Sequence, residues 1–128
     1  MSAVTDTHAL LWWFTESPKL GPRAFQCFEK CEAGEFTILI PTIVIAEALS
    51  LFDKKRILFD FKRLFKQIHE SENFILVPLD YPILQQMVDL KEIPELHDKI
   101  ILSTAKHLDL PIITKDKRIQ NFPNVETI

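Results

Sequence analysis

The sequence has few of the residues on which several common cofactor sites depend. Of its 128 residues only two are glycines, Gly21 and Gly34, so neither a Walker loop nor a GxGxxG dinucleotide turn can be drawn. The two cysteines, Cys27 and Cys31, lie four residues apart with no histidine near them, and such a pair cannot complete a zinc site. Nucleotide-cofactor folds of these kinds are excluded, and we interpret both cysteines as packing residues.

Long apolar runs are also missing. No run approaches the ~20 residues of a membrane-spanning helix, and 26% of the residues are charged. We therefore expect neither a membrane span nor a secretory signal, and a cytoplasmic location. The length and a hydrophobic content of 47% predict a single compact domain over residues 1–128. The net charge of −3 argues weakly against a general nucleic-acid binder. It includes the four acids discussed below, however, whose charge would be offset by a bound metal ion.

Short β-rich runs alternate with longer helical periods along the whole chain. We expect strands at 2–5, 36–40, 74–77 and 111–114, with 125–128 as a fifth. Helices are expected from Thr7, from Ser17 to Gly34 with Ser17 as cap and Pro18 in the first turn, at 41–52, 57–70 and 80–90, and after Pro94 and Glu95. This alternation predicts an α/β fold whose central parallel sheet, of four to five strands, is covered by helices on both faces.

Four carboxylates stand at the ends or inside of apolar segments: Asp6, Glu47, Asp98 and Asp116. Asp6 and Asp116 each follow a predicted strand, and ligands of open parallel sheets bind at that carboxyl edge. Asp98 falls in the first turn of its helix, on the stripe that faces the core. Taken singly, Asp6 or Asp98 could be a helix cap.

Glu47 is the most informative of the four, because its neighbours Ile43, Val44, Ile45, Ala48 and Leu49 leave it little polar company on its own helix. A buried carboxylate without a partner costs several kcal/mol, so it needs a cation or a proton. Together the four acids predict an all-oxygen site for a divalent cation such as Mg²⁺, which supports phosphoryl transfer with an activated water. Thr114 could add a hydroxyl to this site.

Four segments carry a resemblance to a known family. Residues 4–12 (VTDTHALLW), 41–47 (PTIVIAE), 94–101 (PELHDKII) and 110–116 (LPIITKD) resemble, in order and spacing, the four acidic motifs of PIN-domain nucleases. The resemblance covers the whole chain. The size of the chain, with its first acid almost at the amino terminus, is most similar to the VapC-type toxins of toxin–antitoxin pairs.

The resemblance implies a PIN-like three-layer α/β/α fold and Mg²⁺- or Mn²⁺-dependent endoribonuclease activity. It assigns Asp6, Glu47, Asp98 and Asp116 as catalytic metal ligands, and Thr114 as the catalytic hydroxyl that orients the last acid. Water would be the nucleophile, leaving a 5′-phosphate and a 3′-hydroxyl. The implied partners are the RNA substrate, a cognate antitoxin protein that blocks the metal site, and a second copy of the chain in a homodimer.

The chain departs from the family pattern at two positions. Glu95 stands where the family often has aspartate, which makes it a possible accessory acid, and His97 stands where an aromatic residue is common. His97 could contact substrate phosphate, or be a cap or surface histidine; the other histidines, His8 among them, are interpreted as structural.

Basic residues gather in two places. They occur between 54 and 66, including Lys62 and Arg63, and beside the fourth acid at 115, 117 and 118. Either group could bind RNA phosphate. The alternative for the first group is a solvated helix face.

Two other functions stay open. The first is a non-catalytic PIN-fold module that binds RNA or protein, against which the presence of all four acids argues. The second is a metal-dependent phosphatase or phosphotransfer domain. That class requires adjacent acids near the start of the chain, whereas here Asp6 is followed by Thr7.

Overall fold

The computed structural model describes residues 1–55 and 59–128. The strands in this part of the chain are β1 (Ser2–Thr5), β2 (Thr37–Pro41), β3 (Phe74–Val77) and β4 (Ile112–Ile113). The helices are α1 (Thr7–Phe14), α2 (Pro22–Glu32), α3 (Thr42–Lys55), α4 (Phe61–Glu70), α5 (Tyr81–Met87), α6 (Leu96–Leu108) and α7 (Lys117–Gln120). Among these residues no helix is long and apolar enough to cross a membrane.

The four strands form one parallel sheet in the order β3-β2-β1-β4. The chain therefore builds outward from β1 through β2 to β3, and then returns to the other side of β1 with β4. Parallel strands buried on both faces need continuous apolar side chains, and Ala3, Val4, Ile38 and Ile112 are fully buried. The fifth strand expected at 125–128 is reduced to a single bridge between Ile112 and Thr127.

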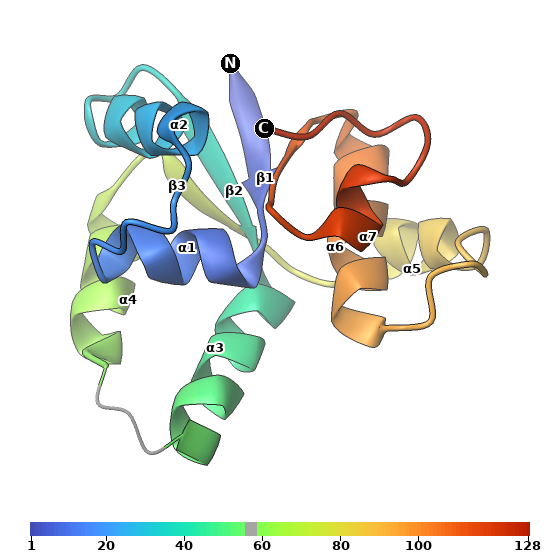
Figure 1. The fold of residues 1–128 in the computed structure, drawn as a ribbon, viewed down its shortest axis with the longest axis horizontal. Helices are drawn as coiled ribbons and strands as arrows, with labels where there is room; N and C mark the ends of the chain where they lie inside the picture. The colour runs from blue at the N-terminus through green and yellow to red at the C-terminus, as the bar shows by residue number, and fades with distance from the viewer. Residues whose placement is uncertain (56–58) are drawn as a thin grey trace.

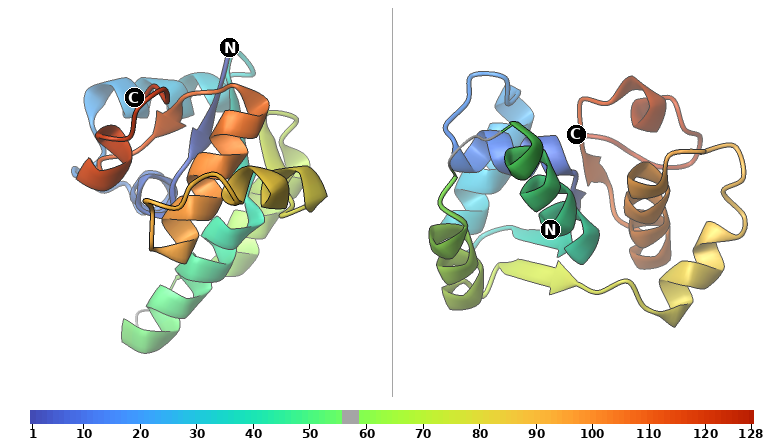
Figure 2. Two further views of the ribbon diagram at one scale, coloured as in Figure 1. Left: turned by 90° about the vertical axis from the view of Figure 1, so that its right-hand side faces the viewer. Right: turned by 90° about the horizontal axis from the view of Figure 1, so that it is seen from below.

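Helices cover both faces of the sheet, as the sequence predicts. Figure 1 shows α1, α2 and α4 on one side and α5, α6 and α7 on the other, and the view from below in Figure 2 shows the same separation. The helix α3 leaves the carboxyl end of β2 and packs against α1 and α6. The predicted α/β class with a central parallel sheet is thus confirmed.

The helix expected from Ser17 begins later, at Pro22. Ser17 does not cap it; its Oγ accepts a hydrogen bond from the Lys19 amide at 3.2 Å and closes a local turn. Gly21 is the cap residue and Pro22 takes the first helical position, where its fixed φ is favourable and its missing N–H costs nothing. Gly34, with φ of 78°, follows the helix as predicted.

The basic helix expected from Ile57 begins at Phe61, where the Asp60 side chain accepts from the Arg63 amide. Arg56 and Ile57 lie outside the described residues. The cysteines are packing residues, as predicted: Cys31 is buried in the core and Cys27 packs against it. Burial raises the pKa of Cys31 to about 11, so its thiol stays protonated and unreactive near neutral pH.

Candidate functional site

The topology brings the predicted acids to one edge of the sheet. The strand order reverses at β1, so β1 and β4 are neighbours and Thr5 pairs with Ile113. Asp6 therefore follows β1 beside the segment that carries Thr114 and Asp116. A cleft of about 200 Å³ opens here, and all four acids and Glu95 line it. The other lining residues are Thr7, His8, Ile101 and Arg118.

Asp6 is held in this cleft by hydrogen bonds to both of its carboxylate oxygens. It caps α1, with Oδ1 accepting a hydrogen bond from the Ala9 amide at 2.9 Å, and its Oδ2 accepts from the Thr114 hydroxyl at 2.5 Å. The residue is only 7% exposed. Burial raises the pKa of Asp6, and this effect outweighs the two hydrogen bonds, which stabilise the ionised form and lower the pKa.

Thr114 connects the first acid to the last. Its hydroxyl donates to Asp6 and accepts from the backbone amide of Asp116 at 3.0 Å. The resemblance assigns this hydroxyl to orienting the last acid, and the contact is to the backbone of that residue rather than to its carboxylate. Asp116 caps the short helix α7 through the Arg118 amide at 2.8 Å. No helix was expected at 117–120, because four residues are too few to show a helical period.

Asp98 is not the cap of its helix. Glu95 takes that position and accepts a hydrogen bond from the Asp98 amide at 2.7 Å. The Asp98 side chain is 14% exposed, and its buried Oδ2 accepts no hydrogen bond. Burial, followed by the charges of Asp116 and Glu95, raises the pKa of Asp98 to about 6. This carboxylate is the least satisfied polar group in the cleft.

Arg118 supplies the cation that stands beside it. Its Nη2 lies 3.2 Å from Asp98 Oδ2, without hydrogen-bond geometry, and 3.4 Å from Asp116 Oδ2. Because the Arg118 side chain is 64% exposed, it can leave the acids without unpacking the core. The sequence indicates Arg118 only as a candidate phosphate ligand beside the fourth acid. Its pairing with two acids depends on the turn into α7.

Glu47 has polar partners, contrary to the expectation from its helix. Its side chain is 24% exposed and accepts a short hydrogen bond from the Thr7 hydroxyl. His97 Nδ1 lies 3.4 Å from Glu47 Oε2 and 2.7 Å from Glu95 Oε1, so this ring bridges two carboxylates. The prediction failed because the partners come from α1 and α6, which the local apolar sequence of α3 cannot reveal.

The structure does not bring Lys62 and Arg63 into the cleft. Both are exposed on α4, which lies on the opposite side of the sheet from α6 and α7 in Figure 1. Arg63 lines a separate groove with Trp13 and Glu29. His8, interpreted from sequence as structural, does line the acidic cleft.

The donor set suits a hard divalent cation in its chemistry. Its carboxylate and hydroxyl oxygens are the ligands that Mg²⁺ and Mn²⁺ prefer, and the Oδ2 of Asp98 accepts no hydrogen bond and is paired only with the Arg118 guanidinium. Within residues 1–55 and 59–128, however, no three His, Cys, Asp or Glu side chains stand close enough to hold one ion. The chemistry of these donors therefore fits such a cation, whereas their spacing in this structure does not, and Arg118 occupies the position between Asp98 and Asp116.

Comparison with known proteins agrees with the resemblance. The family model of the PIN domain matches residues 3–125. A toxin–antitoxin complex from Klebsiella pneumoniae has a similar structure, with TM-score 0.70 and 23% identity over 98% of this chain and 95% of that one. No curated protein matches the chain.

Two further solved structures have the same fold. VapBC2 from Rickettsia felis bound to a DNA fragment from their promoter gives a TM-score of 0.73 and 16% identity, over 100% of this chain and 98% of that chain. FitAcB from Neisseria gonorrhoeae gives a TM-score of 0.66 and 19% identity, over 100% and 96%.

Proposed function

The chain belongs to the PIN domain family, and from this premise we propose that residues 1–128 form one PIN domain that acts as a metal-dependent endoribonuclease. The observation that carries the proposal is the gathering of Asp6, Glu47, Asp98 and Asp116 around one cleft at the carboxyl edge of the sheet. Carboxylates in such a cleft repel one another and lose solvation, which is unfavourable for stability. Arrangements of this kind are typical of sites that bind a cation or carry out catalysis.

Asp6, Glu47, Asp98 and Asp116 would hold Mg²⁺ or Mn²⁺. A bound cation of this kind activates water and neutralises the charge of a phosphodiester. Asp98 is the ligand best prepared for it, because its Oδ2 has no hydrogen bond to give up and only the ion pair with the exposed Arg118 side chain to exchange. Water would attack the phosphorus and leave a 5′-phosphate and a 3′-hydroxyl.

The remaining residues of the cleft position these acids. Thr114 fixes Asp6, and Thr7 fixes Glu47, each through a hydroxyl that donates to the carboxylate. Glu95 and His97 form a pair at the rim, which makes Glu95 an accessory acid rather than a main ligand. Because His97 is held between Glu95 and Glu47, we assign it to positioning and not to phosphate binding.

The proposed biological role is the toxin of a type II toxin–antitoxin pair, with a cognate antitoxin protein as partner. The support is the similarity over the full length to toxin–antitoxin complexes from Klebsiella pneumoniae and Rickettsia felis. An enzyme that cuts cellular RNA in this role works in the cytoplasm.

A homodimer is the proposed assembly. Large apolar side chains that are 40–72% exposed gather on β3, on α5 and in the segments next to α5. They are Ile75, Leu76, Leu79, Tyr81, Leu84 and Val88. Exposed apolar side chains of this size are typical of a protein interface, and β3, at the edge of the sheet, offers a second copy its unpaired backbone groups.

A cleavage assay on total RNA tests the proposed activity. The parent protein should cut RNA with Mg²⁺ or Mn²⁺ and stop when EDTA is added. Asp6→Asn and Asp98→Asn should both abolish cutting, whereas Asp89→Asn, an exposed acid outside the cleft, should not. A parent protein that binds RNA with either metal and never cuts it is the non-catalytic module, and the nuclease proposal then fails.

A further inference from the structure

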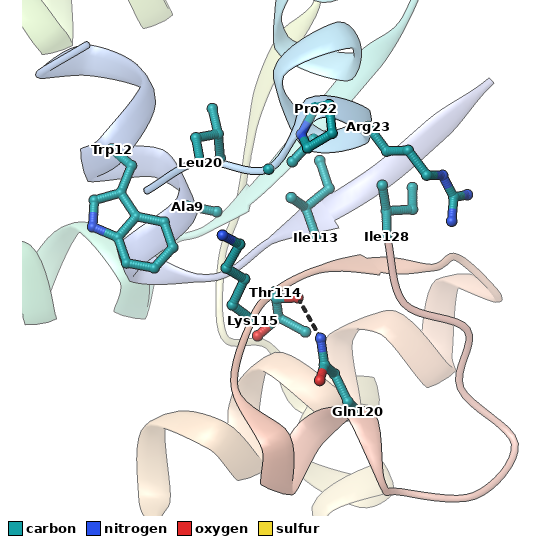
Figure 3. Close-up of a pocket in the computed structure, with 12 residues that line it drawn as sticks. Ala9, Trp12, Leu20, Pro22, Arg23, Ile113, Thr114, Lys115, Gln120 and Ile128 are labelled. Carbon is teal, nitrogen blue, oxygen red and sulfur yellow. Dashed lines mark hydrogen bonds between the residues drawn. The ribbon is translucent and has the colours of Figure 1, made fainter. Parts of the chain in front are cut away.

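A second pocket, of about 240 Å³, lies between α1, the start of α2 and β4. Its walls are largely apolar, with Trp12, Leu20, Pro22 and Ile113 among them, and Figure 3 shows these side chains around one hollow. The Trp12 ring forms one side. The pocket therefore offers a flat aromatic face within an apolar enclosure.

The charged side chains that line this pocket are all basic. Arg23 and Lys115 line it, and no aspartate or glutamate side chain occurs among its described lining residues. Lys115 Nζ lies 5.8 Å from the centroid of the Trp12 ring and donates a hydrogen bond to the Lys19 carbonyl at 2.5 Å. Figure 3 shows this ammonium beside the ring. A ligand of the pocket should thus combine an aromatic or apolar body with negative charge.

The pocket is joined to the acidic cleft at two points. Thr114 lines the pocket, while its hydroxyl donates to Asp6 in the cleft. His8 lines the cleft, and its ring centroid lies 5.8 Å from that of Trp12. The pocket and the acidic cleft are therefore neighbours that share Thr114 and the His8–Trp12 contact.

We propose that this pocket receives a nucleobase of the RNA strand, next to the phosphate that is cut. The proposal rests on the proposed function. Bases in single-stranded RNA are free to leave the stack and to lie on aromatic side chains, and Trp12 provides such a face. Arg23 and Lys115 provide the positive charge for the phosphates that flank the base.

Intrinsic fluorescence tests the pocket directly, since Trp12 and Trp13 are the two tryptophans of the chain. In Trp13→Phe the emission comes from Trp12 alone, and AMP, GMP, CMP or UMP should quench it saturably in EDTA. Ribose 5-phosphate, which lacks a base, should not. In Trp12→Phe the emission comes from Trp13, which stacks on Phe28 with centroids 5.3 Å apart, and no nucleotide should quench it.

Binding of a short RNA, followed by fluorescence anisotropy in EDTA, tests the same pocket independently. Trp12→Ala should weaken binding roughly ten-fold, in line with the loss of one stacked base, and Trp12→Phe should restore most of the affinity. Trp12 lines both this pocket and the neighbouring groove, whereas the exposed Phe25 ring lines the groove alone. Phe25→Ala is therefore the matched control and should bind RNA like the parent. Circular dichroism checks that each variant is folded.

The outcomes separate this inference from the nuclease proposal. If no nucleotide changes Trp12 emission and Trp12→Ala binds RNA like the parent, the base pocket is refuted even when the parent cuts RNA. If nucleotides quench Trp12 but the parent cuts no RNA with Mg²⁺ or Mn²⁺, the pocket stands and the nuclease proposal fails. Quenching by ribose 5-phosphate equal to that by nucleotides would reduce the pocket to a phosphate site and overturn the inference.

Discussion

Removing the charge of Asp98 should stabilise the metal-free protein at neutral pH. Burial and the neighbouring acids raise the pKa of Asp98 from 3.8 to about 6, so the folded state binds this proton more tightly than the unfolded state. Stability therefore falls as pH rises from about 4 to about 6, and the full loss persists above that range. Asp98→Asn has no charge to bury and should escape this loss.

The size of the effect follows from the same displacement of the pKa. One pKa unit corresponds to about 1.4 kcal/mol, so the ionised Asp98 carboxylate destabilises the folded protein by about 3 kcal/mol at pH 7. The pKa of about 6 already includes the attraction of Arg118, which lowers it, so the loss of this ion pair is not subtracted a second time. A gain of about 3 kcal/mol should raise the melting temperature by roughly 10–15 °C for a chain of this length.

Thermal melting in EDTA between pH 4.5 and 8 measures this gain. The parent should lose stability across the titration of Asp98, and Asp98→Asn should lose less, while the exposed Asp89→Asn follows the parent. Added Mg²⁺ or Mn²⁺ should stabilise the parent by mass action and the variant much less. If Asp98→Asn melts below the parent at pH 7.5 without metal and gains as much from metal, Asp98 is a structural residue and this reasoning is wrong.

Three other predictions concern the charges and the apolar surface. Arg118→Gln should bind Mn²⁺ several-fold more tightly in a calorimetric titration, because the guanidinium that competes with the metal is gone. Lys117→Gln, which removes one positive charge next to it, should have little effect. Equal affinities of the two variants would show that Arg118 does not compete. If α4 contacts RNA, neutralising Lys62 and Arg63 together should weaken RNA binding, and the slope of log K against log salt concentration should become less steep by about 1.4. Unchanged affinity and slope, measured by anisotropy, would show that these residues face solvent. Val88→Glu should convert the proposed dimer to a monomer in sedimentation, and a dimer that persists would exclude the α5 surface.

The parts of the site that depend on strand ends were predictable from sequence. Asp6 and Asp116 follow apolar runs, and parallel strands bring their carboxyl ends to one edge. The contacts that cross between distant segments were not. Thr114 reaches Asp6 over 108 positions, and Thr7 reaches Glu47 over 40, and no local period signals such pairs. The start of α2 was misplaced because Ser17 followed by Pro18 has the same signature in a turn as at a helix start.

The cleft combines rigid placement with unfavourable charge. Asp6, Glu95 and Asp116 each cap a helix, so backbone amides fix three of the five acids before any cation is bound. Helix N-termini also carry partial positive charge, which partly offsets the repulsion between these carboxylates. Asp98 has no such amide partner on its buried Oδ2, and Arg118 is the charge beside it. A divalent cation would therefore relieve the unfavourable charge mainly at Asp98. Substitution of Asp98 should weaken metal binding without destabilising the fold, whereas substitution of an acid that caps a helix should do both.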